Sequence, residues 1–497
     1  MTLYPSRRGL LAGGAALAAC GAHLPAWAQD RSAQDLAAEI AALFDPSASR
    51  EARAVFWRDR LSDAGRRRWP QDDFQSFAEA VAATSGGVDV AEVRPLAEPA
   101  PGQLRIGLQA RGGEASIRWV RARYDRDDAS RLFDLSSFPI AGPYDRTGPT
   151  GPVSRETLAL EIERRVRWAA ERDEFSGAVL IGDPSGGTLW SGAFGQADRE
   201  AGRPNRLDTP FHLGSADKSF TAIMIASLIR EGRLGLNTPL IEVLPDYPNP
   251  SFARACTIHH LLAHGSGLGG LFDRPTWDRR APYQRMSDLF VHFAAEPPLF
   301  EPGAGSGYSN EGYVVLGAVL EAVTGRSWYG LLAQRIYAPA GMTGSAHLRF
   351  DEGVGVKAVG YAFPEADILG FGPRARTDAV SGYRGNSCGG GYSTVEDMTR
   401  YLRALRAGRL MPADQLADFT DPAQGAIPNY GRGFVVRRIS ERTLVGHGGG
   451  GARSGIDGDH AIVMETGWSL SIIGNYDAPF AGDVARDVGR WLALQDA

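Results

Sequence analysis

The chain of 497 residues is long for one compact core, since single domains usually span about 100–200 residues, so we expect at least two domains. Hydrophobic residues make up 43% and charged residues 22% of the chain, a balance that excludes an intrinsically disordered protein. The net charge of −5 argues against a nucleic-acid partner, and three cysteines exclude both a disulfide scaffold and a four-cysteine metal site.

The first 28 residues have the pattern of an export signal. Residues 6–11 (SRRGLL) contain a twin-arginine pair, an apolar run follows, and residues 26–28 (AWA) form a small-x-small cleavage site. The run is too short to span a bilayer, so we expect a periplasmic or secreted protein without a transmembrane segment. Residues 17–20 (LAAC) also resemble a lipobox, which would leave Cys20 lipidated. We place cleavage after Ala28 first, because the length of the segment suits a twin-arginine signal better.

Two cysteines remain once the signal is removed. An exported chain meets an oxidising compartment, in which disulfides form and persist. The spacing of Cys256 and Cys388 does not decide between one disulfide and two free thiols, so both alternatives stay open.

Residues 31–138 are predicted to form a small α+β domain. Helical patterns come first, and alternating or apolar stretches at residues 104–108, 117–120 and 132–135 then predict strands. Helices followed by a strand meander resemble a cystatin-like domain, on the order of the elements alone. Residues 139–153, which are rich in Pro and Gly, are expected to form a linker.

Residues 154–497 are predicted to form a second α+β domain. An amphipathic helix over residues 155–172 precedes two strands, and a helical section occupies roughly residues 215–415. Strands return after residue 433, before a closing helix over residues 481–494. Strands near both ends with helices between them predict one mixed sheet that both ends of the domain build together.

Ser215 and Lys218 begin an apolar helix and lie three residues apart, which places them one turn apart on one face. The helix N-terminus offers free backbone N–H groups that could hold an oxyanion. The same field, together with burial, would favour the neutral amine of Lys218 and make it a proton acceptor. Alone, Ser-x-x-Lys is a common pattern, and a capping serine followed by a surface lysine is the simpler interpretation.

Two further segments strengthen the chemical interpretation of this pair. Tyr308 and Asn310 lie on a loop before an apolar helix; near Lys218, the tyrosine could relay the serine proton, and the Asn310 amide could hold the lysine or an acyl group. His447 precedes four glycines at the end of a strand-like run, where a ligand can approach the backbone closely. Gly450 is our candidate for a second oxyanion N–H. Each segment alone would also suit a turn or a glycine-rich hairpin.

These three segments, in this order, resemble the serine β-lactamase and penicillin-binding-protein superfamily, in particular its class C β-lactamase-like esterases and peptidases. The resemblance covers about residues 155–497 and implies a β-lactamase/transpeptidase-like fold. It also implies an acyl-serine mechanism in which Ser215 attacks, Lys218 and Tyr308 move the proton, and two backbone N–H groups hold the oxyanion. Further matching segments are residues 231–236 (EGRLGL), 261–268 (LLAHGSGL), 338–342 (APAGM) and 389–394 (GGGYST).

The third motif departs from the Lys-Thr-Gly or Lys-Ser-Gly sequence of many relatives, because His447 and two glycines stand there. A permanent cation and a hydroxyl are lost, and both help to hold a substrate carboxylate. This favours esters, or small amides and peptides without a carboxylate near the reacting bond. Activity as a β-lactamase or D-Ala-D-Ala carboxypeptidase, and silent binding, stay open as alternatives. Arg453 or Arg384 could replace the cation, although surface positions are the simpler expectation for both.

Three other patterns fail their context tests. Residues 385–389 (GNSCG) match a Gly-x-Ser-x-Gly elbow, but no apolar strand leads into Ser387. His260 and His264 are four residues apart, but no Glu stands beside His260 as a metalloprotease would require. Residues 265–270 contain Gly-x-Gly-x-x-Gly after a helix rather than a strand. We therefore expect no metal, no cofactor and a small ester, amide or peptide as the partner, with the oligomeric state left open.

Overall fold

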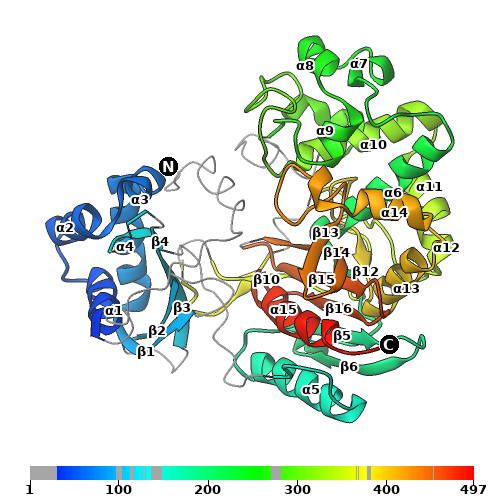
Figure 1. The fold of residues 1–497 in the computed structure, drawn as a ribbon. Coiled ribbons are helices and arrows are strands. Elements are labelled where there is room, and N and C mark those ends of the chain that lie inside the picture. The colour runs from blue at the N-terminus through cyan, green and yellow to red at the C-terminus, as the bar shows by residue number, and fades with distance from the viewer. Residues whose placement is uncertain are drawn as a thin grey trace. The chain divides into compact units, whose positions relative to one another are not determined.

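The fold is taken from a computed structural model. It describes residues 31–96, 103–111, 117–125, 127, 128, 130–135, 148–269, 281–364, 367, 369–377, 382–451 and 453–497. The predicted signal segment, with Cys20, and most of the predicted linker lie outside the described residues. The chain divides into two compact units (Figure 1): one comprises Met1–Asp145 and Ala362–Ala375, and the other Arg146–Tyr361 and Arg376–Ala497.

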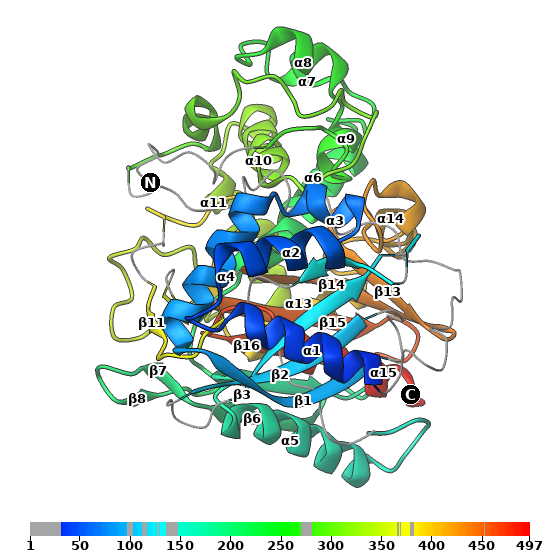
Figure 2. The ribbon, with the colours of Figure 1, turned by 90° about the vertical axis from the view of Figure 1, so that its left-hand side faces the viewer.

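In its described residues, the first unit contains four helices and an antiparallel sheet of four strands (Figure 2). Helices come first and strands follow, and the helices lie across one face of the sheet. The likeness of this unit to cystatin-like domains stays a prediction. The elements are α1 (Arg31–Leu43), α2 (Arg50–Arg60), α3 (Asp63–Arg68), α4 (Gln71–Ser85), β1 (Val88–Leu96), β2 (Gln103–Ala110), β3 (Ile117–Tyr124) and β4 (Leu132–Leu135).

The core of the first unit includes a side chain from far along the chain. Leu369 is fully buried in the same apolar cluster as Ile106 of β2 and Val120 of β3. Burying a leucine side chain is worth about 1.5–3 kcal/mol, so the segment 362–375 contributes to the stability of this unit. No pattern in the sequence indicates this contribution.

Polar contacts hold the same segment in the first unit. Arg118 of β3 donates a hydrogen bond to the Gly370 carbonyl, and its guanidinium lies 5.1 Å from the centre of the Phe363 ring. The Arg374 guanidinium also lies over this ring, at 4.2 Å. Arginine over an aromatic face is attracted by the ring electrons, so Arg118 holds the segment against β3 through one carbonyl bond and one cation–π contact, and the Arg374 contact lies within the segment.

The second unit is an α+β fold around a six-stranded sheet, and its prediction from both ends of the domain is confirmed. The strand order is β13-β14-β15-β16-β5-β6, and neighbouring strands are antiparallel throughout. The prediction that this sheet is mixed is therefore wrong, because both groups of strands join it in antiparallel pairs. Figure 1 shows teal strands from the start of the domain beside orange and red strands from its end. These strands are β5 (Gly177–Gly182), β6 (Thr188–Phe194), β13 (Val435–Ile439), β14 (Arg442–Gly451), β15 (Ile456–Val463) and β16 (Ser469–Gly474).

Helices cover both faces of this sheet. α15 (Phe480–Ala493) contacts β14, β15 and β16 from the face that carries Leu444 and Leu470, and it packs beside α5 (Arg155–Glu171). α13 (Val395–Arg406) contacts β5, β15 and β16 on the other face, since Arg403 and Ser469 both lie against Gly182. Successive strand residues point to opposite faces, so Ser469 and Leu470 mark the two sides.

The helical section lies between the two groups of strands. Its central helix, α6 (Asp217–Arg230), is buried over residues 217–228, as expected of a helix that is apolar on nearly every side. The other α-helices are α7 (Leu240–Val243), α8 (Pro250–Ala255), α9 (Ile258–Leu262), α10 (Asn310–Thr324), α11 (Trp328–Leu332), α12 (Ala338–Ala340) and α14 (Ala413–Phe419), and the short strands are β7 (Gln196–Asp198), β8 (Arg203–Pro204), β9 (Phe211–His212), β10 (Tyr361–Ala362), β11 (Ala375–Arg376) and β12 (Tyr392–Ser393).

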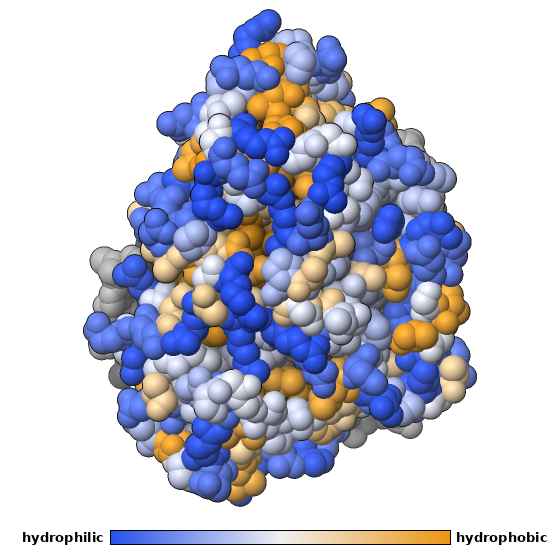
Figure 3. Space-filling view, turned by 90° about the vertical axis from the view of Figure 1, so that its right-hand side faces the viewer, coloured by the Kyte–Doolittle hydropathy of each residue, from blue (hydrophilic) through white to orange (hydrophobic). Residues whose placement is uncertain are grey.

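The surface is largely polar on the face that Figure 3 shows, with hydrophobic residues scattered among hydrophilic ones. Among the described residues, no helix combines the length and the apolar character that crossing a membrane requires. Scattered apolar side chains on a surface need no special explanation.

We predict that Leu369→Ala destabilises the first unit. The substitution leaves a cavity in its core, which should lower the free energy of unfolding by about 2–5 kcal/mol. Hydrogen exchange of the β2 and β3 amides in the intact chain measures this effect. The control is Val354→Ala in the second unit, where the side chain is 74% exposed. Unchanged exchange in Leu369→Ala would contradict the assignment of residue 369 to this core.

Candidate active site

Ser215 and Lys218 meet at the start of α6. Ser215 lies in the 3-10 turn η3 (Gly214–Ala216), and Lys218 follows in the first turn of the helix. The Lys218 side chain is fully buried, and its Nζ lies 3.1 Å from Ser215 Oγ. The sequence spacing therefore brings the two groups within hydrogen-bond distance, as expected for residues one helical turn apart.

Two further oxygens fix the lysine nitrogen. Lys218 Nζ donates to Asn310 Oδ1 at 2.8 Å and to the Cys388 carbonyl at 2.6 Å. Neither oxygen can donate in return, so two of the lysine N–H bonds always point to them. The remaining direction points to Ser215 Oγ. An ammonium donates along it, and a neutral amine accepts the serine proton along it, so this geometry permits proton exchange with Ser215.

Tyr308 and Asn310 reach Lys218 from the start of α10. Ser309 caps this helix, because its Oγ accepts the Gly312 N–H at 2.9 Å. The cap sets the entry of the chain into α10. The centre of the Tyr308 ring then lies 4.9 Å from Lys218 Nζ, in a cation–π arrangement. The structure thus brings together all of Ser215, Lys218, Tyr308 and Asn310.

The glycines of β14 allow the serine turn to lie against the strand. A methyl carbon placed on Gly449 would be 2.5 Å from the Ser215 nitrogen, and one placed on Gly214 would be 2.9 Å from the Gly450 nitrogen. Such distances are well inside van der Waals contact, so neither position accepts a side chain without movement. β14 pairs with β13 only up to Gly446, which leaves the following residues beside the turn.

His447 is buried next to this turn and carries no charge at neutral pH. Burial, reinforced by the nearby Lys218 cation, lowers its pKa to about 4. Its Nδ1 lies 2.5 Å from the Gly448 carbonyl and its Nε2 lies 3.0 Å from the Tyr430 hydroxyl. A neutral ring satisfies both contacts when Nδ1–H donates and Nε2 accepts. This agrees with the expected loss of a permanent cation.

Arg384 and Arg453 were expected at surface positions, and both side chains are half-buried and partly exposed. Arg384 Nε donates to the His347 carbonyl at 2.7 Å, and its guanidinium lies 3.8 Å from the centre of the Tyr329 ring. Arg453 lies beside Asp477, whose carboxylate accepts the Arg453 backbone N–H at 3.3 Å. Half-burial here reflects packing of the long stems against the protein.

The rejected serine elbow is packed inside the second unit. Ser387 is fully buried, and its carbonyl accepts a hydrogen bond from Thr221 Oγ1 at 2.8 Å. A methyl carbon on Gly317 of α10 would lie 2.2 Å from Ser387 Oγ, so the hydroxyl faces a helix at close range. A nucleophile needs room for a substrate carbonyl, which this position does not offer.

The other rejected patterns also have structural roles. His260 Nδ1 accepts the Thr257 N–H at 3.2 Å in a capping box at the start of α9. Within the described residues, no three potential metal ligands gather at one point.

Cys256 and Cys388 are both buried free thiols, and burial raises the pKa of the Cys388 thiol to about 11.

Two residues that contact predicted site residues were not assigned to the site from the sequence. His264 stacks on Tyr308 with ring centres 4.3 Å apart, and Tyr430 bonds to His447. His264 lies in the segment 261–268 that carried part of the family resemblance, which is a signal that could have identified it. Tyr430 has no such signal, because its contact depends on two segments folding together.

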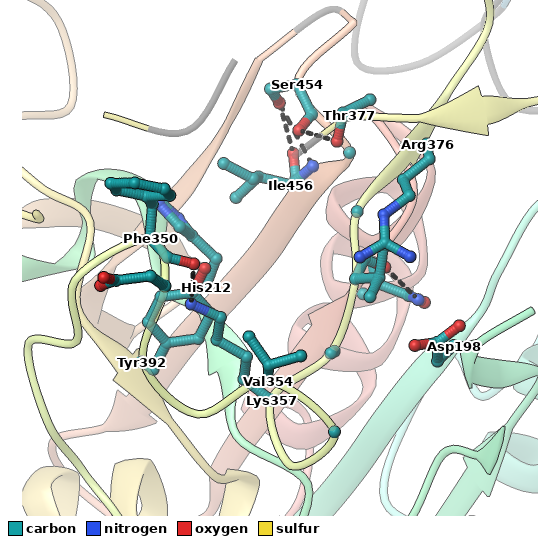
Figure 4. A pocket seen from close by; sticks show the side chains of 18 residues that line it. Asp198, His212, Phe350, Val354, Lys357, Arg376, Thr377, Tyr392, Ser454 and Ile456 are labelled. Carbon is teal, nitrogen blue, oxygen red and sulfur yellow. Dashed lines mark hydrogen bonds between the residues drawn. The ribbon is translucent and has the colours of Figure 1, made fainter. Parts of the chain in front are cut away.

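The second unit contains a cavity of about 330 Å³, and Figure 4 shows the side chains that line it. Its described lining includes His212, Lys357 and Tyr392, and the six predicted site residues are not part of it. His212 links the cavity to the turn, since its Nδ1 accepts the Gly214 N–H at 3.0 Å. The site built around Lys218 is therefore separate from the cavity.

Comparison with known proteins agrees with the fold. Residues 162–493 match the family described as Beta-lactamase. Esterase EstB of Burkholderia gladioli is 28% identical over 362 residues, which cover 64% of this chain and 90% of the esterase. A penicillin-binding protein from Bacillus halodurans has a TM-score of 0.58 at 27% identity, covering 65% of this chain and 98% of its own. D-amino acid amidase from Ochrobactrum anthropi SV3 has a TM-score of 0.56 at 25% identity, covering 68% and 98%.

The shifted pKa of His447 predicts a pH-dependent contribution to stability. Its folded pKa of about 4 lies below the ordinary value of 6.5, so the unfolded chain binds more protons between these values. The stabilisation is complete above pH 6.5 and is lost as the pH falls toward 4. Urea unfolding should show the difference between wild type and His447→Gln shrinking by about 3 kcal/mol from pH 7 to pH 4. A difference that does not vary with pH would contradict a neutral buried histidine.

Proposed function

Because the chain belongs to the β-lactamase family of serine hydrolases, we propose that it hydrolyses esters, or small amides and peptides, through an acyl-enzyme on Ser215. The observation that carries this proposal is the position of Lys218 Nζ. Two fixed acceptors hold it, and its remaining direction points to Ser215 Oγ at 3.1 Å. A positioned proton acceptor beside a hydroxyl is what an activated serine requires.

The proposed reaction has two matching halves. Ser215 Oγ attacks the substrate carbonyl while its proton passes to Lys218, directly or through Tyr308. The N–H groups of Ser215 and Gly450 hold the negative oxygen of the tetrahedral intermediate. The leaving alcohol or amine takes the proton as the acyl-serine forms. Water then attacks the acyl-serine carbonyl and gives a proton to Lys218, directly or through Tyr308. That proton returns to Ser215 Oγ as the acid product leaves.

The neutral state of His447 supports a substrate without a carboxylate near the reacting bond. Both of its ring nitrogens already have partners, Gly448 and Tyr430, and its pKa of about 4 leaves no cation at pH 7. A carboxylate is held best by charge-assisted hydrogen bonds, which a neutral histidine with occupied nitrogens does not supply. The similarity to an esterase and to an amidase supports the same substrate class.

Export of the mature chain is also part of the proposal. It rests on the twin-arginine pair in residues 6–11 and on the cleavage site in residues 26–28. Lipidation at Cys20 is the second candidate. The mass of the chain recovered from the cell envelope distinguishes cleavage after Ala28 from a lipidated cysteine.

Labelling with a fluorophosphonate tests the nucleophile. We predict one covalent adduct by intact mass on the wild-type chain and none on Ser215→Ala, with ester hydrolysis lost in parallel. Ser387→Ala is the matched control, because it removes the serine of the competing Gly-x-Ser-x-Gly pattern. An adduct that survives Ser215→Ala but disappears with Ser387→Ala would overturn the proposal, and no adduct on the wild type would favour silent binding.

A side-by-side substrate panel tests the substrate class. We expect nitrophenyl esters to be turned over with a higher kcat/KM than a chromogenic cephalosporin or D-Ala-D-Ala peptides. In His447→Lys, the ratio of cephalosporin to ester turnover should rise by about tenfold, because one charge-assisted hydrogen bond is worth about 1.5–3 kcal/mol. A wild-type cephalosporin rate above that of every ester would show that the neutral histidine does not set the preference.

A further inference from the structure

His264 occupies a backbone conformation that side chains avoid. It follows α9 with a φ of +64°, in the left-handed region, and it is fully buried. For a residue other than glycine, this conformation costs roughly 1–2 kcal/mol. Such strain persists only where the surrounding structure holds it, and it is concentrated at functional sites.

His264 accepts hydrogen bonds from the loop before α10 on both sides of Tyr308. The His264 carbonyl accepts the Gly307 N–H at 3.1 Å, and the His264 Nδ1 accepts the Ser309 N–H at 3.0 Å. Two hydrogen bonds from one residue thus bracket the tyrosine. The rings of His264 and Tyr308 also stack, with centres 4.3 Å apart and planes tilted by 32°.

The opposite edge of the His264 ring has a buried N–H without a hydrogen-bond partner among the described residues, which also lowers the stability of the fold. Because Nδ1 accepts, the proton of the neutral ring sits on Nε2, which is buried without a hydrogen-bond partner among the described residues. Rings of Tyr308, Tyr313 and Tyr430 surround the imidazole. An unsatisfied buried donor costs about 1–3 kcal/mol, which an apolar side chain at this position would avoid.

The electrostatic surroundings keep this ring in its accepting form. Burial, then the Lys218 cation and the neighbouring His447, hold the pKa of His264 well below its ordinary value. A protonated ring would direct a second N–H at the Ser309 N–H and break that bond. His264 is also unable to act as the proton acceptor for Ser215, since one nitrogen is occupied and the other already carries a proton.

We propose that His264 is a positioning residue that sets Tyr308 and Asn310 against Lys218. Its bond to Ser309 fixes the first turn of α10, from which Asn310 Oδ1 holds Lys218 Nζ at 2.8 Å. Its stacked ring fixes the plane of Tyr308. The inference rests on the proposed function, because it explains how Tyr308 and Asn310 are positioned relative to Lys218 for the proposed proton transfer.

Two substitutions separate this role from a merely structural one. His264→Gly removes the ring and the Nδ1 acceptor while relieving the backbone strain, because glycine adopts positive φ freely. His264→Asn keeps an acceptor oxygen near the position of Nδ1, and asparagine tolerates the left-handed region. We expect kcat for a nitrophenyl ester to fall by about 10²-fold in the glycine variant with KM nearly unchanged, and much less in the asparagine variant.

The matched control is His260→Asn. His260 Nδ1 also accepts a backbone N–H, from Thr257, but at the start of α9. This variant should retain wild-type kcat whatever its effect on thermal unfolding. A kcat loss in the glycine variant that equals its loss of folded protein, or an equal loss in the control, would overturn the proposal.

A double-mutant cycle with Tyr308→Phe separates an effect through Tyr308 from a general loss of folded protein. If His264 acts through Tyr308, each His264 substitution should cost much less in the phenylalanine background than in the wild type. The same factor in both backgrounds would overturn the proposal, and the asparagine variant completes the cycle even if the glycine variant does not fold. Wild-type labelling by the fluorophosphonate is the separate criterion for the proposed function, since its absence removes Ser215 as nucleophile whatever His264 does.

Discussion

A buried nitrogen with three oxygen neighbours is the constraint on which the second unit depends. Lys218 Nζ is removed from water, and an amine or ammonium in such a place is tolerated only when its N–H bonds are satisfied. Its partners come from the turn before α6, from the start of α10 and from the Cys388 carbonyl. Any fold that accommodates this lysine must therefore bring together segments separated by 170 residues.

Close backbone contacts around Ser215 add a steric constraint to the polar contacts of Lys218. The turn that carries Ser215 is enclosed by backbone on two sides, by Gly449 of β14 and by Gly389. A methyl carbon on Gly389 would lie 2.4 Å from the Gly214 carbonyl, and one on Gly449 would lie 2.0 Å from the Leu213 carbonyl. Part of the high glycine content of the chain thus follows from close backbone contact around one serine, in agreement with the role of glycine where backbones approach.

Patterns that repeat along one element were predictable from the sequence. The sheet from both ends of the second unit followed from apolar strand patterns, and Ser215 and Lys218 followed from spacing on one helix. Tyr308 and Asn310 were predicted to join them through the family resemblance. The hydrogen-bond geometry that fixes Lys218 could not be predicted, because one acceptor is the backbone carbonyl of Cys388. Every residue has such a carbonyl, so the residue type gives no signal.

Single contacts over long sequence distances account for the rest of what was missed. Tyr430 meets His447 because a loop returns to β14, and nothing in the residues beside Tyr430 marks that return. Leu369 lies in the short run of residues 368–373 (ILGFGP), which is too short to show a strand or helix period. The sequence marks His264 as a candidate metal ligand and as part of the matching segment 261–268, but its positive φ and its contacts on both sides of Tyr308 become visible only in three dimensions.

The burial of Leu369 also sets an order in which the chain can finish folding. Domains at the N-terminus usually fold first as they leave the ribosome. Here the last side chain of the first core is made roughly 230 residues after β4 ends, which corresponds to about 10–50 seconds at 5–20 residues per second. During that interval the core of the first unit lacks the buried side chain of Leu369. Completion of the N-terminal unit is therefore a late event in synthesis, after the segments that carry Ser215, Lys218 and Tyr308 have already emerged.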